Sequence, residues 1–276
     1  MTAGTSLGNV EVHMTPELLP VTYTPWLIAL SFAVSAVGAY TALSAAGAAR
    51  TDDRRVNRTN VFMGGLALGG IGIWSMHFIG MVAWQVDLSV GYRLLETMVS
   101  LVAAVIVSSL ALGYVASGLV NWRRLLVAGP LAGIGVAVMH YLGMYSMRFD
   151  GFFDWDASVV GVSILIAMVA ATAALWLAFN AKRRSHRVAA ALVMATAVCT
   201  MHYTGMTAAS VMCTAVNRAA MLPGLLRPAD MPVIVAIIAL GVAGIIGTDL
   251  LVQRIQARSG VANDTRLRSS EGVAAR

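Results

Sequence analysis

The stretch ASVVGVSILIAMVAATAALWLAFN, residues 157–180, contains no charged side chain. About 20 such residues cross the hydrocarbon core of a bilayer as a helix, and a helix satisfies its backbone polar groups internally. The stretch is typical of the 276-residue chain, in which 58% of the residues are hydrophobic and 12% are charged. A soluble surface needs more charge than this, so the sequence predicts a multi-pass membrane protein.

On either side of this stretch, further apolar blocks of similar length predict an all-α fold with seven transmembrane helices. The seven blocks cover residues 25–49, 61–84, 94–120, 125–147, 157–180, 188–213 and 231–253. They divide the chain into an N-terminal tail (1–24), a membrane domain (25–253) and a polar C-terminal segment (254–276). We expect this last segment to be a disordered cytoplasmic tail, because it is rich in Arg, Ser and Ala and has no apolar block.

Lys and Arg are distributed unequally between the two sets of loops. One set, together with the C-terminal segment, carries fifteen of the 19, and the other carries only Arg93, Arg148, Arg218 and Arg227. The positive-inside rule predicts that the rich side is cytoplasmic. The N-terminus is then outside and the C-terminus inside a bacterial inner membrane, which requires an odd number of helices. Because the basic residues are split among short loops, we expect them to meet lipid headgroups and not nucleic acid.

The pattern Met-His-x-x-Gly-Met occurs three times, as MHFIGM (76–81), MHYLGM (139–144) and MHYTGM (201–206). Small residues also recur seven and five positions before each His, as Gly or Ala. The near-equal spacing predicts three parallel helix-pair repeats, with the motifs on the second, fourth and sixth helices. Since these helices run in the same direction, we expect the motifs at one depth, in the outer half of the bilayer, about 15 to 22 Å from the outer loops.

A histidine inside a membrane helix is costly unless it faces a partner or water, so the three His are functional candidates. Residues four apart share a helix face, and this pairs each His with the second Met of its motif. Imidazole with thioether is a soft donor set that suits copper. The candidate ligands are His77, Met81, His140, Met144, His202 and Met206. Supporting candidates are Met76, Met139, Met201, Met147 and Cys199, with Tyr141 and Tyr203 as hydrogen-bond partners that orient the imidazoles.

The three motifs on alternate helices resemble the MHYT family of bacterial integral-membrane sensor domains, and the resemblance covers Pro25 to Gln253. It implies a seven-helix domain whose motif His and Met lie near the outer face, where they are proposed to coordinate copper and to sense O₂, CO or NO. Family members often continue into a cytoplasmic output domain. Residues 254–276 do not resemble one, so the resemblance implies a stand-alone form that signals to a separate cytoplasmic partner.

Other functions stay open at this point. The protein could transport or deliver copper, which would require soft ligands at several depths. It could be a membrane b-type haem protein with two of the His as axial ligands, or the His could form a structural hydrogen-bonded cluster. The sequence contains no nucleophile–base pair, paired carboxylates or phosphate-binding loop, so we expect no enzymatic activity.

Overall fold

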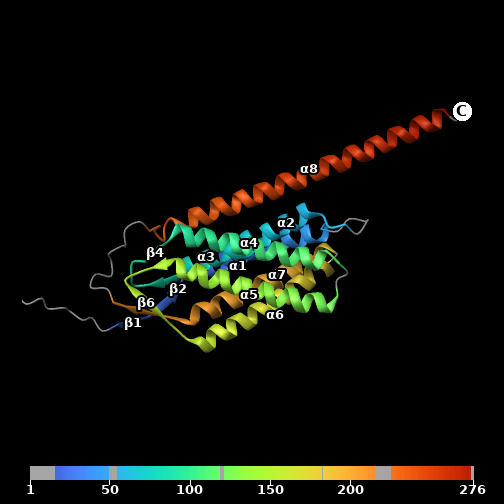
Figure 1. Cartoon of the computed structure of the whole chain (residues 1–276). Helices are drawn as coiled ribbons and strands as arrows, with labels where there is room; N and C mark the ends of the chain where they lie inside the picture. Colours follow the sequence, from blue (N-terminus) through green and yellow to red (C-terminus); the bar gives the residue numbers. More distant parts are fainter. Residues whose placement is uncertain (1–15, 50–54, 119–120, 182, 215–224, 275–276) are drawn as a thin grey trace, which may run out of the picture.

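The computed structural model describes residues 16–49, 55–118, 121–181, 183–214 and 225–274. Within these residues seven helical segments are long and apolar enough to cross a membrane, as the sequence predicts. Figure 1 shows them as one elongated bundle with the long last helix along its side. The helices are α1 (Pro25–Gly47), α2 (Arg58–Leu66) continued by η1 (Ala67–Ser75) and α3 (Met76–Ala83), α4 (Leu94–Ala116), α5 (Trp122–Ser146), α6 (Ala157–Asn180), α7 (Arg184–Thr207) and α8 (Met231–Ala274).

Helix starts are set by local residues that satisfy the first free backbone N–H groups. The side chain of Asn57 accepts a hydrogen bond from the Asn60 amide (3.1 Å), and that of Asn121 accepts one from the Arg124 amide (2.9 Å). Asp156 accepts hydrogen bonds from the amides of the two residues that follow Ala157. Its pKa is lowered, first by the hydrogen bond from the Ser158 side chain and then by these backbone amides.

Seven short strands form a cap at one end of the bundle, on the left in Figure 1. The cap contains a sheet of order β1-β7-β6 and the pairs β2-β3 and β4-β5, all antiparallel. The strands are β1 (Glu17–Leu19), β2 (Val21–Tyr23), β3 (Trp84–Val86), β4 (Gly91–Tyr92), β5 (Met147–Arg148), β6 (Gly151–Trp155) and β7 (Ala209–Cys213). Each motif helix leads directly into one of them, so α3, α5 and α7 run toward the same end.

The structure differs from the sequence prediction in three segments. The sixth span was expected to reach Cys213, but α7 ends at Thr207 because residues 209–213 pair with β1 and β6 in β7. Similarly, residues 17–23 of the N-terminal tail are strands β1 and β2. At the other end of the chain, α8 continues to Ala274 where a disordered tail (254–276) was expected. The sequence contains no Pro after Pro232 that would interrupt α8. Residues 254–274 continue a helix that already exists, so no new helix nucleus has to form.

The second span is the centre of the bundle, because most of it is covered by the helices around it. Its middle, η1, is a nine-residue π-helix, and the side-chain hydroxyl of Ser75 at its end donates a hydrogen bond to the Gly70 carbonyl (2.8 Å). Glycines allow neighbouring backbones to approach here: a β-carbon on Gly38 of α1 would overlap the backbone of Gly72. π-helical turns are rare and often mark functional segments, and this one leads directly into the first motif.

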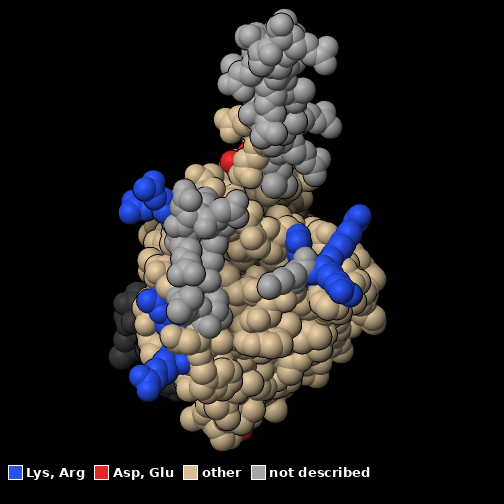
Figure 2. Space-filling view, turned by 90° about the vertical axis from the view of Figure 1, so that its right-hand side faces the viewer, with Lys and Arg blue, Asp and Glu red and all other residues tan. Residues whose placement is uncertain are grey.

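Most Lys and Arg residues of the described chain gather at the end opposite the strand cap, whereas Arg93, Arg148 and Arg227 lie at the cap. Arg58, Arg124 and Arg184 lie in the first turns of helices that run toward the cap, which places them at the other end. Figure 2 views this end and shows blue Lys and Arg side chains around its rim. The structure therefore has the charge asymmetry on which the predicted orientation rests.

Candidate metal centre

The three motif histidines lie near the capped end of the bundle and are fully buried. His77, His140 and His202 are at most 1% exposed. They precede the last residue of α3, α5 and α7 by five or six positions, which is roughly 8 to 9 Å of helix. The site is therefore shallower than the sequence predicted. α3 and α5 end within one residue of the predicted spans, only six residues after their His, and α7 ends at Thr207, before the expected Cys213.

The Nδ1 atoms of the three rings face one another and form a nearly equilateral triangle. The distances are 3.0 Å between His77 and His202, 3.2 Å between His140 and His77, and 3.3 Å between His202 and His140. The rings stand nearly perpendicular to each other, with interplanar angles of 71 to 89°. The expectation that the three motifs lie at one depth is confirmed by this geometry.

Three neutral imidazoles cannot all be satisfied in this triangle. A neutral imidazole carries its hydrogen on one of two ring nitrogens, so each Nδ1 is either a donor or an acceptor. With three rings and two states, at least two Nδ1 atoms are in the same state, and they face each other at 3.3 Å or less. A positive ion at the centre removes this conflict, since all three Nδ1 atoms can then direct lone pairs at it.

The size of the triangle fits a metal ion. Its centre lies about 1.8 Å from each Nδ1, and a metal–imidazole bond is about 2.0 to 2.1 Å long. The three Nδ1 atoms would therefore be able to hold one ion together. These three His are also the group of described His, Cys, Asp or Glu residues whose donor atoms lie close enough together to hold a metal.

The glycine of each motif accommodates the histidine of another repeat. A β-carbon on Gly143 would overlap Nε2 of His77, one on Gly205 would overlap Nε2 of His140, and one on Gly80 would overlap Nε2 of His202. The three contacts thus form a closed ring in which every repeat inserts one imidazole and receives another. The three Nε2 atoms are buried and have no hydrogen-bond partner among the described residues, so these contacts are steric.

Comparison with known proteins identifies two of the three repeats as members of a known family. Residues 70–128 and 133–191 match the family described as MHYT, bacterial signalling protein N terminal repeat. The chain belongs to the MHYT family. The two matched repeats contain the first two motifs, and the third motif, at 201–206, follows them at the same interval.

The curated relatives are signalling proteins that are longer than the chain. The bifunctional diguanylate cyclase/cyclic di-GMP phosphodiesterase MucR of Pseudomonas aeruginosa is 37% identical over 254 residues, which cover 88% of this chain and 36% of MucR. The cyclic di-GMP phosphodiesterase NbdA of the same organism is 35% identical, over 68% of this chain and 24% of NbdA. The signaling protein YkoW of Bacillus subtilis is 30% identical, over 73% and 25%. No solved structure matches the chain.

The chain thus corresponds to the MHYT portion of membrane signalling proteins and spans about a quarter to a third of the relatives it matches. Its seven apolar helices and its family make it a multi-pass membrane protein.

The methionines of the MHYT motifs are buried, as is the triad of His77, His140 and His202. Met81, Met144 and Met206 are at most 1% exposed and belong to one hydrophobic cluster at the capped end, with Met139 and Met147. Met201 packs instead with Ala137 and Ala167 in a separate cluster, and Met76 is also buried. The atoms that the structure brings together at donor distance are the three imidazole nitrogens, so thioether ligation remains a prediction.

The other supporting candidates have different roles from those expected. The hydroxyl of Tyr141 is hydrogen-bonded to Ser163 (2.6 Å) and that of Tyr203 to Ser31 (3.0 Å), so neither orients an imidazole through a hydrogen bond. Their rings pack edge-on against the preceding His instead, as Phe78 does against His77. Cys199 is buried and is not part of the group formed by His77, His140 and His202.

Sequence reasoning found the three His but missed two features of the centre. It did not identify Nδ1 as the convergent atom, because ring orientation depends on the glycine contacts between repeats. It also missed the strand cap. The β-branched and aromatic segments VTY (21–23) and GFFDW (151–155) carried a signal for strands, although the first is shorter than the usual strand.

Proposed function

We propose that this protein is a sensory domain of the bacterial inner membrane in which His77, His140 and His202 bind one copper ion through their Nδ1 atoms. The observation that carries the proposal is the Nδ1 triangle, whose edges of 3.0 to 3.3 Å leave at least one unfavourable pair unless a cation occupies the centre. Membership of a family of signalling proteins supports the sensory role.

The charge of the donor set favours copper in its monovalent state. Imidazoles bind metals as neutral ligands, and the group contains no carboxylate or thiolate. The cost of moving an ion out of water rises with the square of its charge, so a buried neutral site penalises a divalent ion far more than a monovalent one. Cu(I) is the soft monovalent ion that suits imidazole, and the nearby Met81, Met144 and Met206 thioethers suit it as additional donors.

In this proposal the protein detects a change at the triad and transmits it along the helices. Bound copper would supply a coordination position for O₂, CO or NO. The three rings would hold the ion, and each ring packs against the motif glycine of another repeat, Gly80, Gly143 or Gly205. A displacement of one ring would therefore move the helix that carries this glycine. We propose that the N-terminus and strand cap are outside and that the signal leaves at the basic, cytoplasmic end.

The recipient would be a separate cytoplasmic signalling partner. MucR and NbdA carry the names of cyclic di-GMP enzymes, which makes cyclic di-GMP turnover the proposed output. The described helices are the matched MHYT portion, and we propose no catalysis by them.

The geometry favours a metal sensor over the other candidates. A haem iron between two axial imidazoles would hold their nitrogens about 4 Å apart, farther than any edge of the triangle, and would need space for a porphyrin between the rings. A transport path would require ligands beneath the triad. The side chains one turn beneath it are Ile73, Val136 and Val198, which cannot ligate a metal.

The test is metal analysis of the purified full chain, loaded with copper under reducing conditions and separately with zinc. We expect one copper per chain, weaker zinc binding, and loss of copper in His77→Gln, His140→Gln or His202→Gln. His186→Gln is the matched control, because His186 is exposed in the first turn of α7, and it should bind copper like the wild type. Copper binding that survives the triple His change would refute the proposal.

A further inference from the structure

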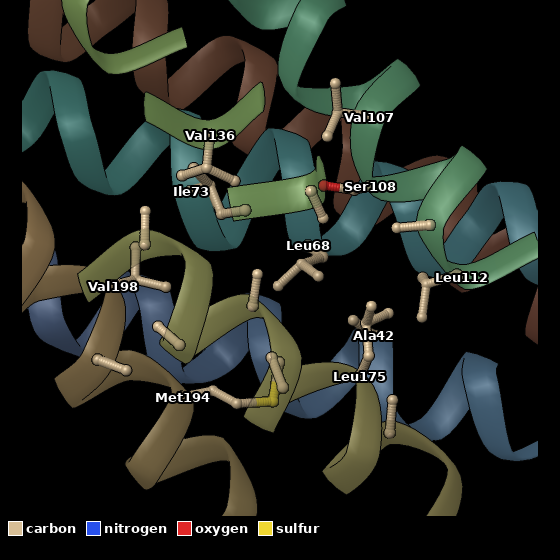
Figure 3. Close-up of a pocket in the computed structure, with 18 of the residues that line it drawn as sticks. Ala42, Leu68, Ile73, Val107, Ser108, Leu112, Val136, Leu175, Met194 and Val198 are labelled. Carbon is tan, nitrogen blue, oxygen red and sulfur yellow. The ribbon is translucent and has the colours of Figure 1, made fainter. Parts of the chain in front are cut away.

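A cavity lies in the middle of the bundle, between the triad and the basic end. It has a volume of about 60 Å³ and is lined by residues of α1, η1, α4, α5, α6 and α7. Figure 3 shows side chains from these helices pointing into a common space, with Leu68 near its middle. α6 contributes mainly alanines, including Ala167, Ala171 and Ala174, and their small size leaves the space open.

The cavity is aligned with the triad. Ile73, Val136 and Val198 line its end nearest the motifs, and they are grouped at the left of Figure 3. Each precedes a His of the triad by four residues, which is about one helical turn. Each repeat therefore contributes one imidazole to the triad. One helical turn deeper, at the equivalent position in each repeat, it contributes one branched aliphatic side chain to the end of the cavity nearest the triad.

The chemistry of the lining determines what can occupy the cavity. Among the described residues that line it, Ser108 alone has a polar side chain. An ordered water needs two to four polar partners, and cavities lined by aliphatic side chains stay dry and take up apolar guests. A charged or strongly polar guest would lose its hydration without compensation.

We propose that this cavity is a binding site for a small, uncharged, apolar molecule of a few heavy atoms, located one helical turn beneath the histidine triad. Its volume is less than half of the roughly 150 Å³ of an engineered cavity that binds benzene, so the guest is smaller than an aromatic ring. The site is separate from the metal centre, and its existence does not depend on whether the triad binds copper.

Xenon is the probe that tests this site, because it is apolar, uncharged and compact. We would record the methyl NMR signals of Ile73, Val136 and Val198 in the full chain under increasing xenon pressure. We expect shifts that saturate, as binding to a discrete site requires. Shifts that are absent, or that grow linearly with pressure as general partitioning into the micelle would produce, would overturn the proposal.

One substitution that fills the cavity and one that enlarges it should change xenon binding in opposite directions. A general loss of folding would not produce this pattern. Ala171→Leu fills the cavity and should abolish the saturable shifts, whereas Ala173→Leu, on the exposed side of the same helix, should leave them unchanged. Leu112→Ala enlarges the cavity, since Leu112 lines it and is 2% exposed, and should increase xenon affinity several-fold. If Ala171→Leu kept the saturable shifts, or Leu112→Ala failed to increase affinity in a folded protein, the assignment would be wrong.

All of these measurements are made without added metal, and they separate the two proposals. Failure of copper binding would leave the xenon result unaffected, and failure of xenon binding would leave the triad unaffected.

Discussion

Nε2 of His77 packs so closely against Gly143 that a β-carbon on this glycine would overlap it. This contact explains why the motif has Gly three residues after His: any larger residue in one repeat would displace the imidazole supplied by another. The same relationship joins His140 to Gly205 and His202 to Gly80. The glycine of the motif is therefore a positioning residue for the triad and not a hinge.

Gly143→Ala should reduce copper affinity at least tenfold while the protein remains folded. The added methyl pushes the His77 ring out of the triangle, and disturbing groups that orient metal ligands typically costs 10- to 100-fold in affinity. Copper titration of the purified protein measures this effect. Gly161→Ala is the control, because a β-carbon there meets nothing within 4 Å, and equal affinity of the two variants would contradict the role assigned to Gly143.

Copper should raise the thermal stability of the wild-type protein. A ligand that binds only the folded state, at 100 times its dissociation constant, stabilises it by about 2.7 kcal/mol. We expect a higher melting temperature in detergent with Cu(I) than after treatment with a chelator, and no such difference in His140→Gln. A chelator effect of the same size in the variant would indicate that the metal acts elsewhere.

Trp74→Phe should destabilise the bundle by about 1 to 3 kcal/mol. The indole N–H of Trp74 lies 3.1 Å from both the Thr97 carbonyl and the Ser100 hydroxyl, in the fully buried interior. Phe cannot donate this hydrogen bond, so buried acceptors lose a partner. Thermal unfolding followed by circular dichroism tests the prediction against Trp26→Phe, which changes an indole that is 65% exposed and should alter stability little.

The strand cap should be accessible from outside intact cells. A cysteine introduced as Asp154→Cys, at an exposed position of β6, should react with a membrane-impermeant maleimide. Asn121→Cys, exposed at the opposite end, should react only after lysis. The wild-type chain gives the background, since Cys199 and Cys213 are both buried. The reverse labelling pattern would show that the proposed orientation is inverted.

The sequence predicted the spans well because hydrophobic length alone determines them. The predicted spans 157–180 and 231–253 begin and end at the same residues as the corresponding apolar segments of the structure. The sixth span was displaced because Ala209–Cys213 is apolar enough to continue a helix but is held in a sheet by β1 and β6. Pairing between distant segments is a tertiary effect that apolar length does not encode.

The candidate site was predictable at the level of residues but not of atoms. Three His at one depth followed from the repeat and from the direction of the helices. The packing of α3, α5, α6 and α7 determines which ring nitrogens face one another. It also determines that the Tyr141 hydroxyl is hydrogen-bonded to Ser163 and not to a neighbouring imidazole. The π-helix η1 likewise has no simple sequence signature, although Gly69 allows the backbone of α4 to pack closely against it.

The closed ring of imidazoles and glycines has a consequence for how the three repeats can move. Because each motif helix both inserts a side chain into one neighbour and holds a side chain of the other, none of them can rotate alone without a clash or a void. A rotation of one motif helix therefore requires the other two to move with it. Replacing a single histidine should accordingly disable the assembly as completely as replacing all three.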